Sequence, residues 1–399
     1  MSGTDITNAK LTYRERNEGD FPPQLHIILE KEWDLKYGEN PNQHAAIYFL
    51  ANARKIAELT NLQSVRSDGK GKGGLSLTNT MDITRAMDNL KFFRDTPVAV
   101  VMKHNIVSGF AKQTNGQSQV ELYRLARDAD RRSSHGGTIA FTQPLGMETA
   151  NALFELYDQG HIIDVVAAPD YDEGVIGRIE KGSKNVRIGQ FSSLDKLPRF
   201  PGDETYGLLS IKEMPTGRFG VQDIYLTSIK GPEQLITDPF VVDKQATKHA
   251  IETTPTSAQL DDLLTSWWLN VAGARSNGIV LVRNGVSVAV GSGQVERVGA
   301  VEQCIVKALQ KAMDREGIRY DPLMGITGHE QLRDNPLIGA AASSDAFFPF
   351  PDSVGLLGRM GIGSIIQPCG SVHDGEVIDE ANKWKIPMVA TLERCFGHF

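Results

Sequence analysis

The 399-residue chain is poor in cysteine and has no long apolar run, and both absences exclude whole classes of protein. Its three cysteines, Cys304, Cys369 and Cys395, lie far apart, which excludes a disulfide framework and a four-thiolate zinc site. No apolar stretch approaches the roughly 20 residues of a membrane-spanning helix, and we find no signal-peptide core. We therefore expect a cytoplasmic protein without a membrane partner.

An excess of positive charge is also missing. Lys plus Arg is 42 and Asp plus Glu is 49, so the formal net charge of −7 argues against a nucleic-acid partner. The nine histidines form no HExxH motif, and Val372 follows Pro368-Cys369 where a zinc deaminase has its second cysteine. We therefore expect no catalytic metal.

The sequence does contain an alternation of helical and strand patterns. Apolar residues recur at helical spacing over 83–93, and the apolar run 98–102 that follows is typical of a strand covered on both faces. Residues 162–168 form a second such run. Thr256 and Gln259 have the spacing of a capping box at the start of another helix. These patterns predict an α/β protein.

A similar order of elements in the two halves suggests an internal duplication. In each half a buried strand precedes a serine pair, Ser133-Ser134 or Ser343-Ser344, and a strand ending in proline comes next. The length fits two domains. We predict an N-terminal arm at 1–35, a first domain at 36–215, a crossover segment at 216–240 and a second domain at 241–399.

The pair Lys103-His104 directly follows the 98–102 run, at a strand end where ligands gather in open α/β sheets. A histidine there suits a general base, and the adjacent lysine suits an anion. The alternative is a surface lysine beside a hydrogen-bonded histidine. Asn277 offers donors and acceptors for a carboxamide, although spacing alone favours a helix C-cap.

Aromatic residues gather in two places. Three phenylalanines lie between Asp345 and Asp352, and they suit either a flat pterin ring or a plug in the core. The last seven residues contain Arg394 and two further phenylalanines. This composition favours a docked tail whose arginine suits a phosphate.

Four short motifs occur along the chain: KYGENPNQ at 36–43, KHNIVSG at 103–109, SDAFFPF at 344–350 and RCFGH at 394–398. In this order they resemble the RYGENPHQ, KHNNPCG, SDAFFPF and RHFRH-type motifs of one family. It is the 5-aminoimidazole-4-carboxamide ribonucleotide (AICAR) formyltransferase of purine synthesis, usually the C-terminal part of a bifunctional enzyme. The resemblance runs from about residue 33 to the C-terminus.

The resemblance implies a fold of two tandem cytidine-deaminase-like α/β/α domains with mixed sheets and no catalytic zinc. It implies a homodimer whose active sites lie at the subunit interface. The implied substrate is AICAR and the implied co-substrate is 10-formyltetrahydrofolate.

The resemblance also implies roles for individual residues. The catalytic residues would be Lys103, His104 and Asn277. The nucleotide would be bound by Lys36, Tyr37, Gly136, Asp164, Arg394 and Phe396. The folate would be bound by Arg297, Phe347, Pro349 and Asp352.

The motifs also depart from the family pattern. Lys36 replaces the usual arginine, which keeps the charge and loses the two-pronged guanidinium, and residues 106–108 replace Asn-Pro-Cys. Two alternatives stay open: a catalytically inactive nucleotide-binding relative, and a formyltransferase that uses another one-carbon donor. Because only 35 residues precede Lys36, we expect no IMP cyclohydrolase activity in this chain.

Overall fold

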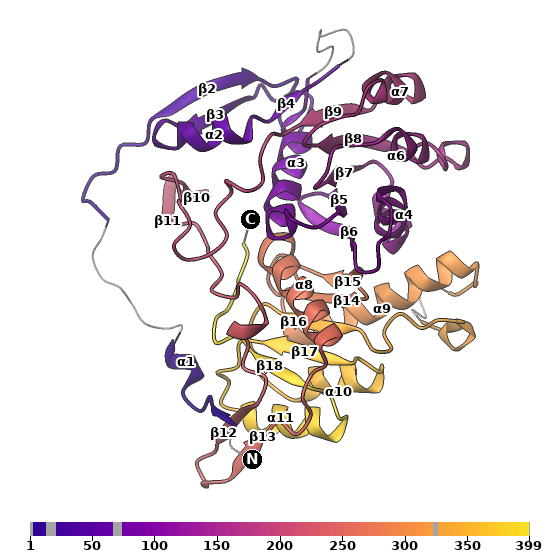
Figure 1. The fold of residues 1–399 in the computed structure, drawn as a ribbon. Helices are drawn as coiled ribbons and strands as arrows, with labels where there is room; N and C mark the ends of the chain where they lie inside the picture. The colour runs from indigo at the N-terminus through magenta and orange to yellow at the C-terminus, as the bar shows by residue number, and fades with distance from the viewer. Residues whose placement is uncertain (1–2, 13–20, 67–73, 322–325, 399) are drawn as a thin grey trace.

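A computed structural model describes residues 3–12, 21–66, 74–321 and 326–398 (Figure 1). An eleven-stranded mixed sheet forms its centre. The strands are β4 (Gln63–Ser64), β5 (Val98–Lys103), β6 (Ile106–Lys112), β7 (Gly137–Phe141), β8 (Ile163–Ala168), β9 (Arg187–Gln190), β14 (Ile279–Arg283), β15 (Val286–Gly291), β16 (Ala341–Ser344), β17 (Ser364–Gln367) and β18 (Met388–Ala390). Their order across the sheet is β18-β17-β16-β14-β15-β6-β5-β7-β8-β9-β4. The predicted α/β class is confirmed.

Helices cover both faces of the sheet (Figure 1). On one face α3 (Leu77–Leu90) and α8 (Ser257–Gly273) pack against each other, and the Asn89 side-chain amide donates to the Ala272 carbonyl at 3.3 Å. The opposite face is covered by α4 (Gln119–Ala129), α6 (Met147–Ala152), α7 (Val175–Gly182), α9 (Arg297–Glu316), α10 (Asp352–Arg359) and α11 (Asp374–Lys383). Within the described ranges, no helix combines the length and apolar character needed to cross a bilayer.

The suspected duplication is present in the strand topology. The hairpin β5–β6 leads through α4 to β7, which is antiparallel to β5, and then to β8 and β9, which run parallel to β7. The hairpin β14–β15 leads through α9 to β16, β17 and β18 in the same arrangement. The serine pairs are not equivalent, however, because Ser133-Ser134 precede β7 whereas Ser343-Ser344 end β16.

Strand β5 shows why its sequence is apolar throughout. Val98, Val100 and Met102 pack in the core cluster under α3, while Ala99 and Val101 pack in the cluster under α4. All five side chains are at most 2% exposed. Because both faces are covered, all five of these residues are apolar and there is no alternation with polar residues. The sequence pattern predicted this burial on both faces.

The predicted N-terminal arm docks at two separate places, in its described residues. Strand β1 (Thr4–Asp5) pairs with β12 (Pro239–Val242) beside the second half of the sheet. Strand β2 (Leu29–Asp34) pairs instead with β3 (Ala46–Leu50), near the first half (Figure 1). Residues 1–2 and 13–20 of the arm lie outside the described residues.

The predicted crossover segment begins within a hairpin. Strands β10 (Leu209–Met214) and β11 (Arg218–Asp223) pair antiparallel, so the predicted boundary after residue 215 lies in their turn. The domain limits at 35, 215 and 240 stay a prediction.

Gly109 allows the close contact between β6 and α4, and its replacement should destabilise the fold. A Cβ atom added at Gly109 would lie 1.9 Å from the Ala126 carbonyl oxygen of α4. We expect Gly109→Ala to lower the free energy of unfolding by about 3 kcal/mol, since the clash is with backbone. Denaturant unfolding followed by circular dichroism measures the change.

Gly177 in α7 provides the control, because a Cβ added there would meet no atom within 4 Å. Gly177→Ala should raise the free energy of unfolding by about 0.5–1 kcal/mol, as expected for alanine in a helix. Equal effects of the two substitutions would contradict the packing argument.

Candidate functional site

Lys103 and His104 lie where β5 turns into β6. Lys103 is the last residue of β5, and His104 and Asn105 form a two-residue hairpin turn with φ of 53° and 63°. Two successive positive φ values define the type I′ turn, whose usual residues are Asn and Gly. A histidine in this conformation is uncommon, because left-handed φ strains residues with a Cβ atom. The turn therefore presents a histidine at a conformation that its surroundings must stabilise.

Asp82 of α3 holds this turn, and the sequence analysis did not single it out. Its carboxylate accepts a hydrogen bond from the Asn105 backbone N–H at 2.7 Å. Burial raises the pKa of Asp82, while the Asn105 hydrogen bond and the charges of His104 and Lys103 oppose that rise. No local sequence signal marks Asp82, since an aspartate within an amphipathic helix is ordinary and its partner lies 23 residues away.

The Lys103 ammonium reaches towards the start of β7. It donates to the backbone carbonyls of His135 at 2.7 Å and Gly136 at 2.8 Å. Gly136 has φ of 64°, and a Cβ added there would lie 3.0 Å from the Lys103 nitrogen and 3.6 Å from the Asp164 carboxylate. Three of the predicted site residues, Lys103, Gly136 and Asp164, are thus brought together.

Lys36 and Tyr37 lie in the loop between β2 and β3, at the N-terminal end of α3. The Leu77 N–H of α3 donates to the Tyr37 carbonyl at 3.3 Å. The Lys36 ammonium lies 5.6 Å from the centre of the Tyr37 ring. Leu77 and Asp82 are separated by about 8 Å along the helix axis, at 1.5 Å per residue. The same helix therefore supports both this loop and the His104 turn.

A second group of residues surrounds the start of β14. The backbone N–H and the side-chain amide of Asn277 both donate to the Gln294 carbonyl, at 3.1 and 3.0 Å. Helix α8 ends at Gly273 and is followed by Ala274 as its C-cap, so the helix-cap explanation for Asn277 is wrong. Ser276 precedes Asn277 through a cis peptide bond.

Asp345 organises this second group from the end of β16. It forms a buried ion pair with Arg297, whose side chain is 6% exposed, and its other carboxylate oxygen accepts from the Ser276 hydroxyl. Its backbone carbonyl accepts from the Cys395 N–H at 2.9 Å. Arg297 therefore directs its charge at a carboxylate of the protein.

The C-terminal segment is docked, as its composition predicted. Ser276 N–H donates to the Gly397 carbonyl at 2.9 Å, and the Glu393 carboxylate accepts from the Ser228 N–H at 2.8 Å. The Arg394 guanidinium lies 4.9 Å from the centre of the Phe396 ring, and Phe396 is 41% exposed. In Figure 1 this segment runs from the second half of the sheet towards the first.

The aromatic motif divides between the core and the surface. Phe348 is buried, and its backbone N–H donates to the Gln367 side chain at 3.0 Å, whereas Phe347 and Pro349 are half-buried. The prediction of a core plug is therefore right for Phe348.

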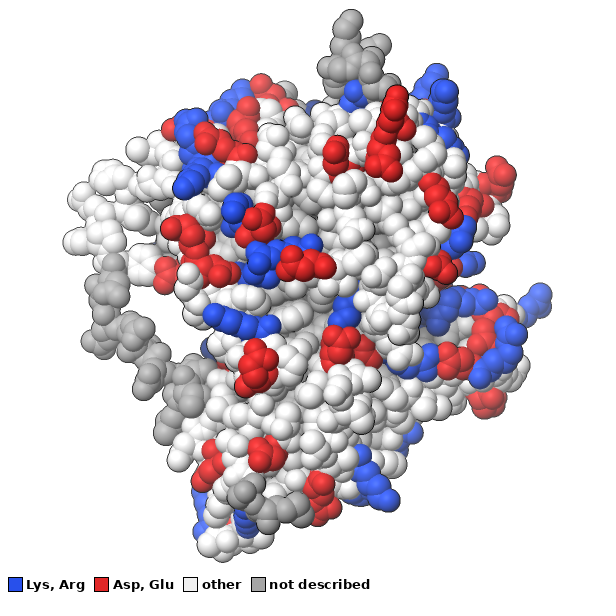
Figure 2. Space-filling view, in the orientation of Figure 1, with Lys and Arg blue, Asp and Glu red and all other residues white. Residues whose placement is uncertain are grey.

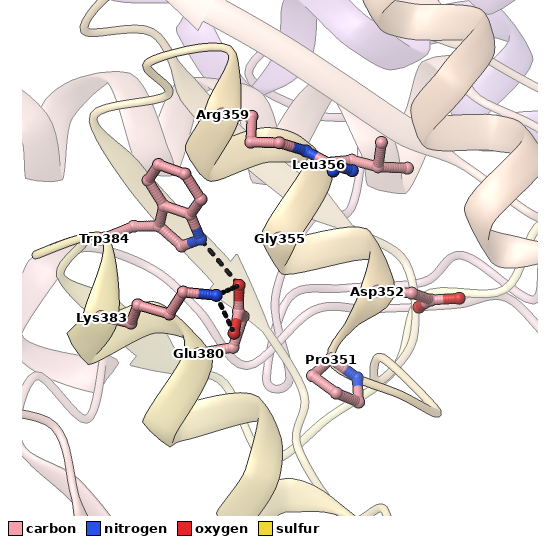
Figure 3. Close-up of a pocket in the computed structure, with 8 residues that line it drawn as sticks. All are labelled: Pro351, Asp352, Gly355, Leu356, Arg359, Glu380, Lys383 and Trp384. Atoms are coloured by element: carbon pink, nitrogen blue, oxygen red, sulfur yellow. Dashed lines mark hydrogen bonds and ion pairs between the residues drawn. The ribbon is translucent and has the colours of Figure 1, made fainter.

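Asp352 begins α10 and lines a pocket of about 360 Å³ between α10 and α11 (Figure 3). In this pocket Glu380 accepts hydrogen bonds from Lys383 and from the Trp384 ring N–H, while the Asp352 carboxylate points away from Glu380. No other predicted site residue is among those that line this pocket.

Strand directions place both groups at one end of the sheet, which we call the His104 end. Strand β5 ends there, and β7 and β8 begin there, because β7 is antiparallel to β5 and parallel to β8. Following the antiparallel pairs from β5 through β6, β15 and β14 to β16 puts the start of β14 and the end of β16 at the same end. Two strands, β6 and β15, lie between β5 and β14, and these two pair at Ala111 and Val286, away from the His104 end.

The charges on the visible face are mixed. Figure 2 shows Lys and Arg side chains interspersed with Asp and Glu rather than collected in a field of one sign. Among the described residues, no three His, Cys, Asp or Glu side chains are arranged to hold a metal ion.

Comparison with known proteins identifies the family. Residues 5–307, more than half of the chain, match the family model described as AICARFT/IMPCHase bienzyme. The chain belongs to this family, which agrees with the resemblance of its four motifs.

Curated relatives named bifunctional purine biosynthesis protein PurH match nearly the whole chain. The protein of Caldicellulosiruptor saccharolyticus is 32% identical over 384 residues, which cover 96% of this chain and 62% of the relative. That of Persephonella marina is 31% identical over 395 residues, with coverages of 99% and 64%. That of Dictyostelium discoideum is 31% identical over 397 residues, with coverages of 100% and 63%. The chain thus spans a little over three fifths of the length of these relatives.

Gly136→Ala tests whether Gly136 sets the place of the Lys103 ammonium. The substitution puts a methyl group 3.0 Å from that nitrogen, so we expect the side-chain nitrogen resonance of Lys103 to shift. The free energy of unfolding should fall by about 1–2 kcal/mol, because alanine is strained at φ of 64°.

Gly160→Ala is the matched control. Gly160 has φ of 79° and no atom within 4 Å of an added Cβ, so the backbone strain is similar and the contact is missing. We expect a similar loss of stability with the Lys103 resonance unchanged. The same Lys103 spectrum in wild type and Gly136→Ala would show that the two residues do not interact.

Proposed function

We propose that this chain transfers the formyl group of 10-formyltetrahydrofolate to the 5-amino group of AICAR. The product is 5-formamidoimidazole-4-carboxamide ribonucleotide, in de novo purine biosynthesis. The observation that carries the proposal is the His104 turn, in which a histidine directly follows a lysine at the end of β5. Membership of the family supports it, since the matching family model names an AICARFT activity.

In the proposed reaction a C–N bond forms between the 5-amino nitrogen and the formyl carbon, and the bond from that carbon to N10 breaks. The amine is a weak nucleophile because its lone pair is conjugated with the ring and the carboxamide. His104 accepts the proton that the amine loses. Lys103 stabilises the tetrahedral oxyanion and helps to protonate N10 of the leaving folate. Asn277 orients the amine, so that part of the rate comes from placement.

The remaining residues divide between the two substrates. Lys36, Tyr37, Gly136, Asp164, Arg394 and Phe396 bind the nucleotide, with Lys36 and Arg394 at its phosphate. Arg297, Phe347, Pro349 and Asp352 bind the folate. The short distances among Lys103, Gly136 and Asp164 support the first set, and the half-buried ring of Phe347 supports the second.

We further propose that the active protein is a cytoplasmic homodimer. Each subunit consists of two cytidine-deaminase-like repeats and has no catalytic zinc. The repeated hairpin and three-strand topology supports the repeats. Lys103 donates to the carbonyls of His135 and Gly136, whereas Asn277 donates to the carbonyl of Gln294, so different parts of the chain hold the two groups. A site completed by the partner subunit accounts for this separation.

The direct test supplies AICAR and 10-formyltetrahydrofolate to the purified chain and follows tetrahydrofolate formation. His104→Ala should lower the rate at least about 10²-fold, because it removes the general base. Nucleotide binding, measured by calorimetry, should persist. His329→Ala is the control, since the imidazole of His329 hydrogen-bonds to the Ile326 carbonyl and belongs to neither the Lys103 group nor the Asn277 group.

Other outcomes distinguish the alternatives. A His104→Ala enzyme with the wild-type rate would remove the assignment of His104 as the base. Binding of AICAR without turnover would favour an inactive relative, and turnover with formate and ATP alone would favour another one-carbon donor. Incubation with the formylated nucleotide tests the expectation that this chain forms no inosinate.

A further inference from the structure

Both repeats hold their first hairpin turn by an aspartate from the preceding helix. In the second repeat the turn between β14 and β15 consists of Asn284 and Gly285, with φ of 54° and 74°. Their backbone N–H groups donate to the Asp262 carboxylate of α8 at 2.7 and 2.8 Å. In the first repeat Asp82 of α3 accepts from Asn105. We call each aspartate the turn clamp of its repeat.

The two turn clamps occupy equivalent positions. Helix α3 has Ser76 as N-cap and α8 has Thr256, each in a capping box with the third residue of the helix. Asp82 and Asp262 are each the sixth residue after their N-cap. Burial is the largest influence on both carboxyl groups and raises the pKa of each. The clamp is therefore a structural element of the repeat, present in both copies.

The surroundings of the two clamps differ in one respect. The second turn has Asn-Gly, which adopts left-handed φ at little cost, and neither residue ionises. The charges that act on Asp262 come from Asp261 and Lys112, outside the turn. Asp82 instead faces His104 of the turn itself and Lys103 before it, and it is also hydrogen-bonded by the Thr138 side chain of β7. The charges that act on the first clamp thus come from residues of the proposed chemistry.

We propose that Asp82 is a positioning residue for His104, which fixes the turn that carries the imidazole and stabilises its cation when it accepts the amine proton. This inference rests on the proposed function. A carboxylate near a histidine favours the protonated form, and here the carboxylate is half-buried beside an exposed imidazole. The hydrogen bond from the Asn105 N–H ties the hairpin turn that carries His104 to α3.

The pH dependence follows from the direction of the Asp82 pKa. Burial raises this pKa, so on acidification Asp82 takes up its proton before an ordinary aspartate does. The groups that face it are His104 and Lys103 from the hairpin and Thr138 from β7, and the two charged ones oppose the rise. Loss of the carboxylate charge at low pH removes the support for the imidazolium.

The test compares Asp82→Asn with Asp262→Asn in the full chain, with AICAR and 10-formyltetrahydrofolate as substrates. Both variants should lower the unfolding midpoint by a comparable amount, because each weakens one turn clamp. Asp82→Asn should lower kcat about 10²-fold, the usual scale for acid–base groups. Its KM should stay within about twofold, since the nucleotide contacts are intact. The acid limb of its pH–rate profile should move to lower pH, whereas Asp262→Asn should keep the wild-type kcat and profile.

Rescue and spectroscopy complete the test. Asp82→Glu keeps the charge and should recover part of the lost kcat. In imidazole NMR spectra, Asp82→Asn should shift the His104 ring resonances and Asp262→Asn should not. Equal kcat losses in both variants, a loss only in KM, or an unchanged pH profile in Asp82→Asn would overturn the inference. If the wild-type chain shows no turnover, the proposed function fails. The positioning role is tested separately by NMR, because His104 resonances that do not shift in Asp82→Asn would contradict it.

Discussion

The pairing of β6 with β15 is the interaction on which the arrangement of the site depends. It joins two five-strand repeats into one sheet, antiparallel at Val286 and Ala111. Because the repeats meet antiparallel, the first hairpin turn of one repeat lies at the end of the sheet where the first strand of the other begins. His104 and Asn277, which are far apart in sequence, therefore share one end. A parallel junction would have placed them at opposite ends.

The two repeats use the same kind of aspartate contact to hold hairpin turns of different composition. In both copies a helix aspartate accepts hydrogen bonding from the backbone of the turn, and in the second copy it holds an Asn-Gly turn with no ionisable group. In the first copy the same geometry holds a histidine next to a lysine. The hydrogen bond that the turn needs in any case is thus made next to the imidazole. The two copies differ in the residues of the turn and in the charges near each aspartate.

Sequence patterns predicted local structure well where the cause was local. The continuous apolar run of β5 and the capping box at Thr256 were both confirmed. The prediction failed where distant segments compete for the same residue. A helix cap explained Asn277 by spacing, but helix α8 ends earlier and Asn277 bonds the Gln294 carbonyl instead. Similarly, the serine pairs looked equivalent, although Ser133-Ser134 end the short helix Arg131–Ser134 and Ser343-Ser344 end strand β16.

By itself the sequence determined the α/β class, the place of Lys103 and His104 at a strand end, and the family through its four motifs. These features depend on periodicity, on capping and on residues adjacent in the chain. The tertiary structure alone decided that Asp82 holds the His104 turn and that Asp345 holds Arg297 and the C-terminal segment. The sequence around an aspartate in a helix or after a strand does not reveal its hydrogen-bond partner, because that partner is set by the pairing of strands far away in the chain.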